Sequence, residues 1–131
     1  MQYVDGKATG LKVAYIGGGS RGWAWGFMTD LAMDSGMEGT VRLYDIDRDA
    51  AEKNRLIGEK TAHHEKAVSH WQYEVADSLK DALTGVDFVV ISILPGTFEE
   101  MKSDVHAPER VGVYQSVGDT AGPGGLMRAL R

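Results

Sequence analysis

The sequence contains no cysteine, which excludes disulfide bridges, thiolate metal sites and a cysteine nucleophile. It also has no excess of basic residues, because 14 Lys and Arg stand against 19 Asp and Glu, for a formal net charge of -5. A surface of this charge gives no electrostatic reason to expect binding to nucleic acid or to an anionic membrane. We therefore expect neither kind of partner.

Long hydrophobic runs are absent as well. The longest strongly apolar stretch, residues 88–94, is far shorter than the roughly 20 residues that span a bilayer. The first ten residues are polar or small and lack the apolar run of a secretory signal. The sequence therefore predicts a cytoplasmic protein with a flexible N-terminus over residues 1–10 and one globular domain over residues 11–131.

What the sequence does contain is an alternation of strand and helix patterns. Strands are expected over residues 12–16, 41–46, 71–75 and 88–93, and the last of these reads as the most buried. Helices are expected over residues 23–35, 49–66 and 77–83, the second of them facing solvent. Two more are expected to start near Thr97, before a break at Pro108, and after the glycines of 122–125. The alternation predicts an α/β fold, a Rossmann-type doubly wound parallel sheet.

A glycine-rich loop, Gly17-Gly18-Gly19-Ser20-Arg21-Gly22, follows the first expected strand and precedes a helix. This context favours a dinucleotide site, because backbone N–H groups at a helix N-terminus can hold a pyrophosphate. Gly17 would permit the tight turn, and Gly19 would let the backbone approach the phosphates. Gly22 would let the helix pack closely on the strand.

An acidic residue, Asp45, ends the second expected strand at about the spacing of 20 residues that this motif requires. Its carboxylate would accept hydrogen bonds from the adenosine ribose and repel a 2'-phosphate, which favours NAD over NADP. Arg42 and Arg48 nearby could instead accommodate that phosphate. Asp47 and Asp49 are interpreted as helix-capping residues.

Other nucleotide-binding classes are weighed against this one. A nucleoside-triphosphatase loop is disfavoured because no Gly-Lys-Ser/Thr follows the glycines, and Arg21 does not replace that lysine. A methyltransferase remains possible at this point, since such enzymes also hold adenosine with a glycine loop and an acid after the second strand.

The segment after the fourth strand is more specific. Residues 91–96 (ISILPG) lead into 98–101 (FEEM), and residues 117–126 read VGDTAGPGGL. Together with the glycine loop and residues 44–47 (YDID), these motifs resemble glycoside hydrolase family 4, and the resemblance covers residues 11–131.

The resemblance implies an NAD- and divalent-metal-dependent glycosidase, a hydrolase of carbohydrate metabolism outside the usual two-carboxylate scheme. In this family NAD oxidises C3 of the sugar, a base removes the C2 proton, the leaving group is eliminated, water adds and the hydride returns. The metal is usually manganese. The full-length protein is expected to be a homo-oligomer that hydrolyses a small α-glycoside, most consistently an α-galacturonide.

The resemblance also assigns site residues. Asp119 is expected to be the catalytic residue of this chain, an acid beside the tyrosine base. The cofactor-binding residues are expected to be Gly17, Gly18, Gly19, Ser20, Arg21, Gly22, Asp45, Ser92, Pro95 and Gly96, the last three on the nicotinamide side.

Two departures from the family pattern matter. The metal-binding cysteine and histidine and the tyrosine base are not reached before Arg131, so the chain alone is expected to be inactive and to precede a catalytic, metal-binding C-terminal domain. Residues 99–103 (EEMKS) lack the arginine of phospho-glycosidases, which favours the α-galacturonidase or α-glucosidase branch. The four histidines, His63, His64, His70 and His106, are interpreted as surface residues.

Two alternatives remain. The domain could be the cofactor domain of an NAD-dependent 2-hydroxy acid dehydrogenase of the malate and lactate type, which would produce net NADH. It could also be a non-enzymatic nucleotide-binding module.

Overall fold

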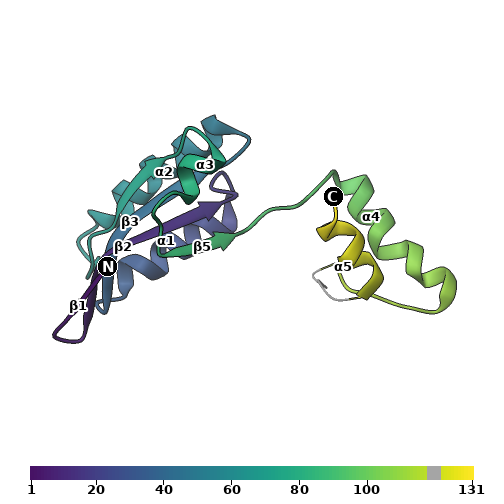
Figure 1. The fold of residues 1–131 in the computed structure, drawn as a ribbon, viewed down its shortest axis with the longest axis horizontal. Coiled ribbons are helices and arrows are strands. Elements are labelled where there is room, and N and C mark those ends of the chain that lie inside the picture. Colours follow the sequence, from purple (N-terminus) through teal and green to yellow (C-terminus); the bar gives the residue numbers. More distant parts are fainter. Residues whose placement is uncertain (118–121) are drawn as a thin grey trace. The chain divides into compact units, whose positions relative to one another are not determined.

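The computed structural model describes residues 1–117 and 122–131. The chain forms two compact units, Met1–Ile93 and Leu94–Arg131 (Figure 1). Each unit is described by itself.

The first unit is built on a five-stranded sheet whose centre is strand β2 (Lys7–Ile16). On one side β2 pairs in parallel with β3 (Met37–Tyr44), which pairs in parallel with β4 (Gln72–Val75). On its other side β2 pairs in parallel with β5 (Phe88–Ile91). The parallel strands thus lie in the order β4-β3-β2-β5, the arrangement of the first half of a Rossmann sheet. The predicted fold class is confirmed.

The N-terminal residues differ from the expected flexible segment. Strand β1 (Gln2–Val4) pairs antiparallel with the start of β2, which begins at Lys7 instead of Lys12. Asp5 and Gly6 connect the two strands, both with positive φ. Two such residues suit the tight turn of a β-hairpin.

Three helices accompany this sheet, α1 (Gly22–Met33), α2 (Arg48–Ala62) and α3 (Leu79–Leu83). Alternate residues of β2 and β3 bury their side chains against α1 and α2, and the core formed there contains Val13, Tyr15, Met28, Val41 and Leu43. On α2 the buried residues are Ala51, Asn54, Gly58 and Ala62. The prediction that α2 faces solvent was therefore wrong for the side of the helix that carries these residues. Because these buried residues are small or polar, they leave no apolar stripe in the sequence.

Strand β5 is the clearest departure from the sequence prediction. It was expected to be the most buried strand, yet Phe88 is 56% exposed and Ile91 is 70% exposed. A continuous apolar run is typical of a strand buried on both faces, as in the interior of a parallel sheet. Among the described residues, β5 pairs only with β2 and is therefore an edge strand.

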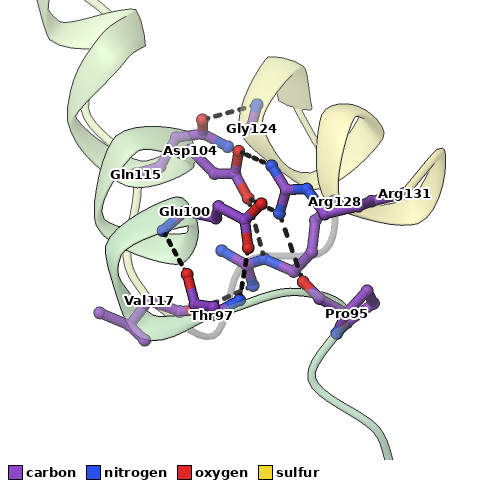
Figure 2. Close-up of polar contacts among 9 residues, drawn as sticks. All are labelled: Pro95, Thr97, Glu100, Asp104, Gln115, Val117, Gly124, Arg128 and Arg131. Atoms are coloured by element: carbon purple, nitrogen blue, oxygen red, sulfur yellow. Dashed lines mark hydrogen bonds and ion pairs between the residues drawn. The ribbon is translucent and has the colours of Figure 1, made fainter.

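The second unit contains helix α4 (Phe98–His106), a 3₁₀ turn η1 (Ala107–Val111) and helix α5 (Gly122–Ala129). Both helices were predicted, and α4 starts at a capping box in which Thr97 and Glu100 bond reciprocally. The buried carboxylate of Asp104 on α4 accepts two hydrogen bonds from the Arg131 guanidinium, at 2.9 and 3.0 Å (Figure 2). This bidentate ion pair ties α4 to the residues after α5.

Within the described ranges, no helix is long and apolar enough to cross a membrane.

Candidate cofactor-binding site

Three segments predicted from the sequence meet at the carboxyl ends of neighbouring strands. The glycine loop follows β2, Asp45 follows β3, and Ser92 follows β5. The chain leaves β2 for β3 on one side, and β5 pairs on the other, so the loop lies where the strand order reverses. Ligands of open α/β sheets bind at such a switch point.

The turn at Gly17 depends on glycine. Its φ is +96°, and a Cβ at this position would lie 1.9 Å from the Ser92 carbonyl oxygen. The N–H groups of Gly17 and Gly18 both donate to the Tyr44 carbonyl, at 2.8 and 2.9 Å. A Cβ on Gly18 would lie 2.8 Å from the Leu43 Cβ. The loop is therefore pressed between the ends of β3 and β5.

Gly19 lies directly against Asp45. Its N–H donates to Asp45 Oδ2 at 2.8 Å, and the Asp47 N–H donates to Asp45 Oδ1 at 2.9 Å. A Cβ on Gly19 would lie 2.9 Å from Asp45 Oδ2 and 2.8 Å from the Ala50 Cβ. Each carboxylate oxygen keeps a further acceptor site, so Asp45 can still receive ribose hydroxyls.

Gly22 corrects one part of the predicted motif. A Cβ on Gly22 would have no atom within 4 Å, so close packing of helix on strand does not require glycine here. Gly22 is the first residue of α1 and is exposed, as is Arg21, while Ser20 is half-buried. Because the first N–H groups of a helix have no intrahelical acceptor, this end of α1 presents donors.

The arginines near Asp45 differ in their availability. Arg42 Nε donates to Glu74 at 2.6 Å, and Arg42 Nη1 donates to carbonyls of Asp81 and Thr84 at 2.8 and 3.1 Å. Its guanidinium is therefore engaged on the sheet face that α3 covers. Arg48 is exposed and pairs with Asp77 at 2.7 Å. This arrangement leaves only Arg48 of the two as a possible partner for a 2'-phosphate.

The acids at the start of α2 behave as predicted. The Asp47 side chain accepts the Ala50 N–H at 3.0 Å and caps the helix, and Asp49 lies in its first turn. A capping role is confirmed for Asp47, and the position of Asp49 suits the helix dipole.

Asn54 is a residue of this site that the sequence reading missed. It is 3% exposed, on α2, and its amide contacts the carbonyls of Gly18 and Ser20. The spacing of Ala51, Asn54, Gly58 and Ala62 along α2 is that of one helix face. That spacing could have placed Asn54 on the sheet side of the helix.

Pro95 and Gly96 belong to the second unit and are described with it. The Pro95 carbonyl accepts a hydrogen bond from Arg131 Nη1 at 3.3 Å (Figure 2). Gly96 has a φ of +92°. Asp119, the predicted catalytic residue, lies outside the described residues.

The acids at the start of α4 have a structural function. Glu100 Oε2 accepts the Thr97 N–H at 2.5 Å, and the Glu100 N–H donates to Thr97 Oγ1 at 3.3 Å (Figure 2). The backbone and side-chain hydrogen bonds to Thr97 lower the pKa of Glu100 below its ordinary value. Glu100 therefore completes the helix cap, and both Glu99 and Glu100 are exposed.

Metal-binding groups are sparse. All four histidines are exposed, as predicted. In the part of the chain that the structure describes, no group of three or more His, Cys, Asp or Glu residues could hold a metal ion.

Comparison with known proteins agrees with this geometry. Residues 12–131 match the family described as Family 4 glycosyl hydrolase. An α-galacturonidase of Lachnoclostridium phytofermentans is 63% identical over 131 residues, which are 100% of this chain and 28% of that protein.

Solved structures show the same fold. The crystal structure of lplD from Bacillus subtilis is 53% identical with a TM-score of 0.73, over 93% of this chain and 27% of that one. A 6-phospho-beta glucosidase of Thermotoga maritima, solved with manganese, NAD+ and glucose-6-phosphate, is 23% identical with a TM-score of 0.65, over 92% and 28% of the two chains. The chain thus spans little more than a quarter of the length of these relatives. Because the family match covers nearly all of its residues, the chain belongs to family 4 of the glycosyl hydrolases.

Proposed function

We propose that this chain is the NAD-binding part of a family 4 glycosidase that hydrolyses α-galacturonides. The observation that carries the proposal is the contact between the glycine loop and Asp45 at the switch point of the sheet, where the Gly19 N–H donates to Asp45 Oδ2 at 2.8 Å. A phosphate-binding loop and a ribose-binding carboxylate are thereby held side by side.

The residues present suit NAD. The loop from Gly17 to Gly22 would hold the pyrophosphate through the Arg21 and Gly22 N–H groups and the Ser20 side chain, because the N–H groups of residues 17–20 donate within the protein. Asp45 would hold the adenosine ribose. The open space beside Gly22 leaves room for the phosphates next to the first N–H groups of α1. When bound, NAD supplies a reversible hydride acceptor for C3 of the sugar.

The remaining site residues are assigned by the family resemblance. Ser92, Pro95 and Gly96 would lie on the nicotinamide side of the cofactor, and Ser92 is already against Gly17 at the end of β5. Asp119 would support the base that removes the C2 proton. The family resemblance assigns the divalent metal, manganese in our proposal, to a cysteine and a histidine that these 131 residues do not include. Among the described residues, no group of three or more His, Cys, Asp or Glu could hold it.

The substrate assignment rests on similarity and on charge. The Lachnoclostridium phytofermentans relative is an α-galacturonidase at 63% identity, and residues 99–103 offer no arginine to a sugar phosphate. Family membership also favours a glycosidase over the alternative of a 2-hydroxy acid dehydrogenase.

We further infer a cytoplasmic homo-oligomer. NAD dependence requires access to the intracellular cofactor pool. The homo-oligomeric state is proposed from the family resemblance. Light scattering of the intact protein would measure the subunit number.

Calorimetric titration of the protein with NAD and with NADP tests the cofactor assignment. We expect NAD to bind more tightly than NADP, because Asp45 accepts from an unmodified ribose and repels a 2'-phosphate. Tighter binding of NADP, or binding of neither dinucleotide, would contradict the proposal.

A further inference from the structure

The side chain of Asn54 makes three hydrogen bonds beside the glycine loop. It lies on α2 and is 3% exposed. Its Nδ2 donates to the Gly18 carbonyl at 2.7 Å and to the Ser20 carbonyl at 2.8 Å. Its Oδ1 accepts the Trp25 Nε1–H at 2.7 Å. Both amide protons of Asn54 are thus used on the loop.

These contacts fix which way the amide faces. An indole N–H can only donate, so the Asn54 oxygen must face Trp25. The nitrogen of the same amide must then face the two loop carbonyls, which can only accept. Trp25 therefore sets the orientation of Asn54, and Asn54 sets the orientation of the loop carbonyls.

Two peptide groups of the loop are oriented as a consequence. In a trans peptide the C=O and the following N–H point in opposite directions, and the described residues contain no cis peptide bond. With the Gly18 carbonyl toward Asn54, the Gly19 N–H points the other way, to Asp45 Oδ2. With the Ser20 carbonyl toward Asn54, the Arg21 N–H points away from α2.

We propose that Asn54 is a positioning residue for the dinucleotide pyrophosphate. By turning the Gly18 and Ser20 carbonyls toward α2, it keeps their partially negative oxygens away from the phosphates. The Arg21 N–H is then presented to the phosphates. Asn54 itself does not touch the cofactor. This inference rests on the proposed function, because it assumes that the loop binds the pyrophosphate of NAD.

The test compares two ligands in the intact protein. NAD carries a pyrophosphate and adenosine does not, while both carry the ribose assigned to Asp45. Asn54→Leu has a similar volume and removes all three hydrogen bonds. We expect it to weaken NAD binding about ten-fold or more, because the Gly18 and Ser20 carbonyls are no longer held away from the phosphates, and to leave the Kd for adenosine within about two-fold.

Val41→Ala is the matched control. Val41 is fully buried in the core, away from the loop, so this substitution lowers stability without changing the loop carbonyls. We expect both Kd values to remain within about two-fold of those of the unsubstituted protein. Unfolding in urea without ligand shows whether the two variants are comparably destabilised.

A second variant and a measurement on the unsubstituted protein keep the proposal testable if Asn54→Leu misfolds. Asn54→Asp keeps an acceptor for Trp25 but faces the loop carbonyls with oxygen, so the same selective loss of NAD affinity is expected. In the unsubstituted protein, the Asn54 side-chain NH₂ protons should remain slowly exchanging in NMR spectra with and without NAD.

The outcomes separate the two proposals. If the unsubstituted protein binds no NAD, the proposed function is contradicted together with this inference. If it binds NAD and Asn54→Leu binds NAD equally well, or loses NAD and adenosine to the same extent, only the role of Asn54 is overturned. Fast exchange of the Asn54 NH₂ protons on NAD binding would overturn that role as well.

Discussion

The Asp45 carboxylate has one structural role and one proposed binding role. It holds the Gly19 and Asp47 N–H groups, and it is proposed to hold the adenosine ribose. Asp45→Asn retains the size and one oxygen but removes the charge. Because hydrogen bonds to a charged group contribute about 1.5–3 kcal/mol, we expect NAD affinity to fall at least ten-fold, while the preference for NAD over NADP narrows.

Calorimetric titrations of Asp45→Asn and of the unsubstituted protein, each with both dinucleotides, check this expectation. Arg48→Gln is titrated in the same way, because Arg48 is the exposed arginine near Asp45. An unchanged ratio of the NAD and NADP Kd values in Asp45→Asn would remove Asp45 from the ribose site.

Gly17 and Gly22 are expected to matter for different reasons. Gly17 is required by the fold of the loop, and Gly22 by the ligand. Gly17→Ala would combine a φ of +96° with a Cβ 1.9 Å from the Ser92 carbonyl oxygen. We expect it to lose at least about 2 kcal/mol of unfolding free energy, since the left-handed conformation alone costs about 1–2 kcal/mol. Urea unfolding measures this loss, and a Gly17→Ala variant of unchanged stability would refute this view of the turn.

Gly22→Ala should do the opposite. A Cβ at this position meets no protein atom within 4 Å, and alanine favours a helix, so stability should be kept or slightly raised. NAD binding should nevertheless weaken if the phosphates approach the start of α1. Normal NAD binding by a stable Gly22→Ala variant would show that the cofactor stays clear of this residue.

At the scale of elements, the order of strands and helices from β2 onward could be predicted because each strand pattern is short and α2, α3 and α4 have local start signals. Thr97 with Glu100, and Asp47 before α2, are such signals. The burial of β5 and the role of Asn54 could not be predicted. Both depend on neighbours distant in the sequence, β2 in the first case and the glycine loop in the second.

The second unit offers an element-scale prediction about pH. Hydrogen bonding by Arg131, with the positive charges of Arg131 and Arg128, lowers the pKa of Asp104 below its ordinary value. Because the folded-state pKa is below that of the unfolded chain, the stabilisation is complete above the unfolded value and is lost as pH falls through the folded one. We therefore expect α5 to detach from α4 on acidification below about pH 4.

Helical circular dichroism and amide exchange of α4 and α5, followed from neutral to acid pH, measure this transition. Asp104→Asn removes the titrating group, so its signal should be weaker at neutral pH and should lack most of the acid transition. An acid transition of the same size in Asp104→Asn would assign it to other carboxylates.

At the scale of the whole molecule, the chain is proposed to supply the cofactor site, and it covers only 28% of the Lachnoclostridium phytofermentans α-galacturonidase. The most direct measurement therefore uses a chimera in which this chain replaces the matching part of that enzyme, with the parent enzyme as control. Release of p-nitrophenol from p-nitrophenyl α-galacturonide is followed with manganese present and with NAD either supplied or removed.

Our account predicts that the chimera hydrolyses the galacturonide only when NAD is supplied, and that no NADH accumulates because the hydride returns to the sugar in each turnover. Hydrolysis at the same rate without NAD, or NADH formed in proportion to the substrate consumed, would contradict it.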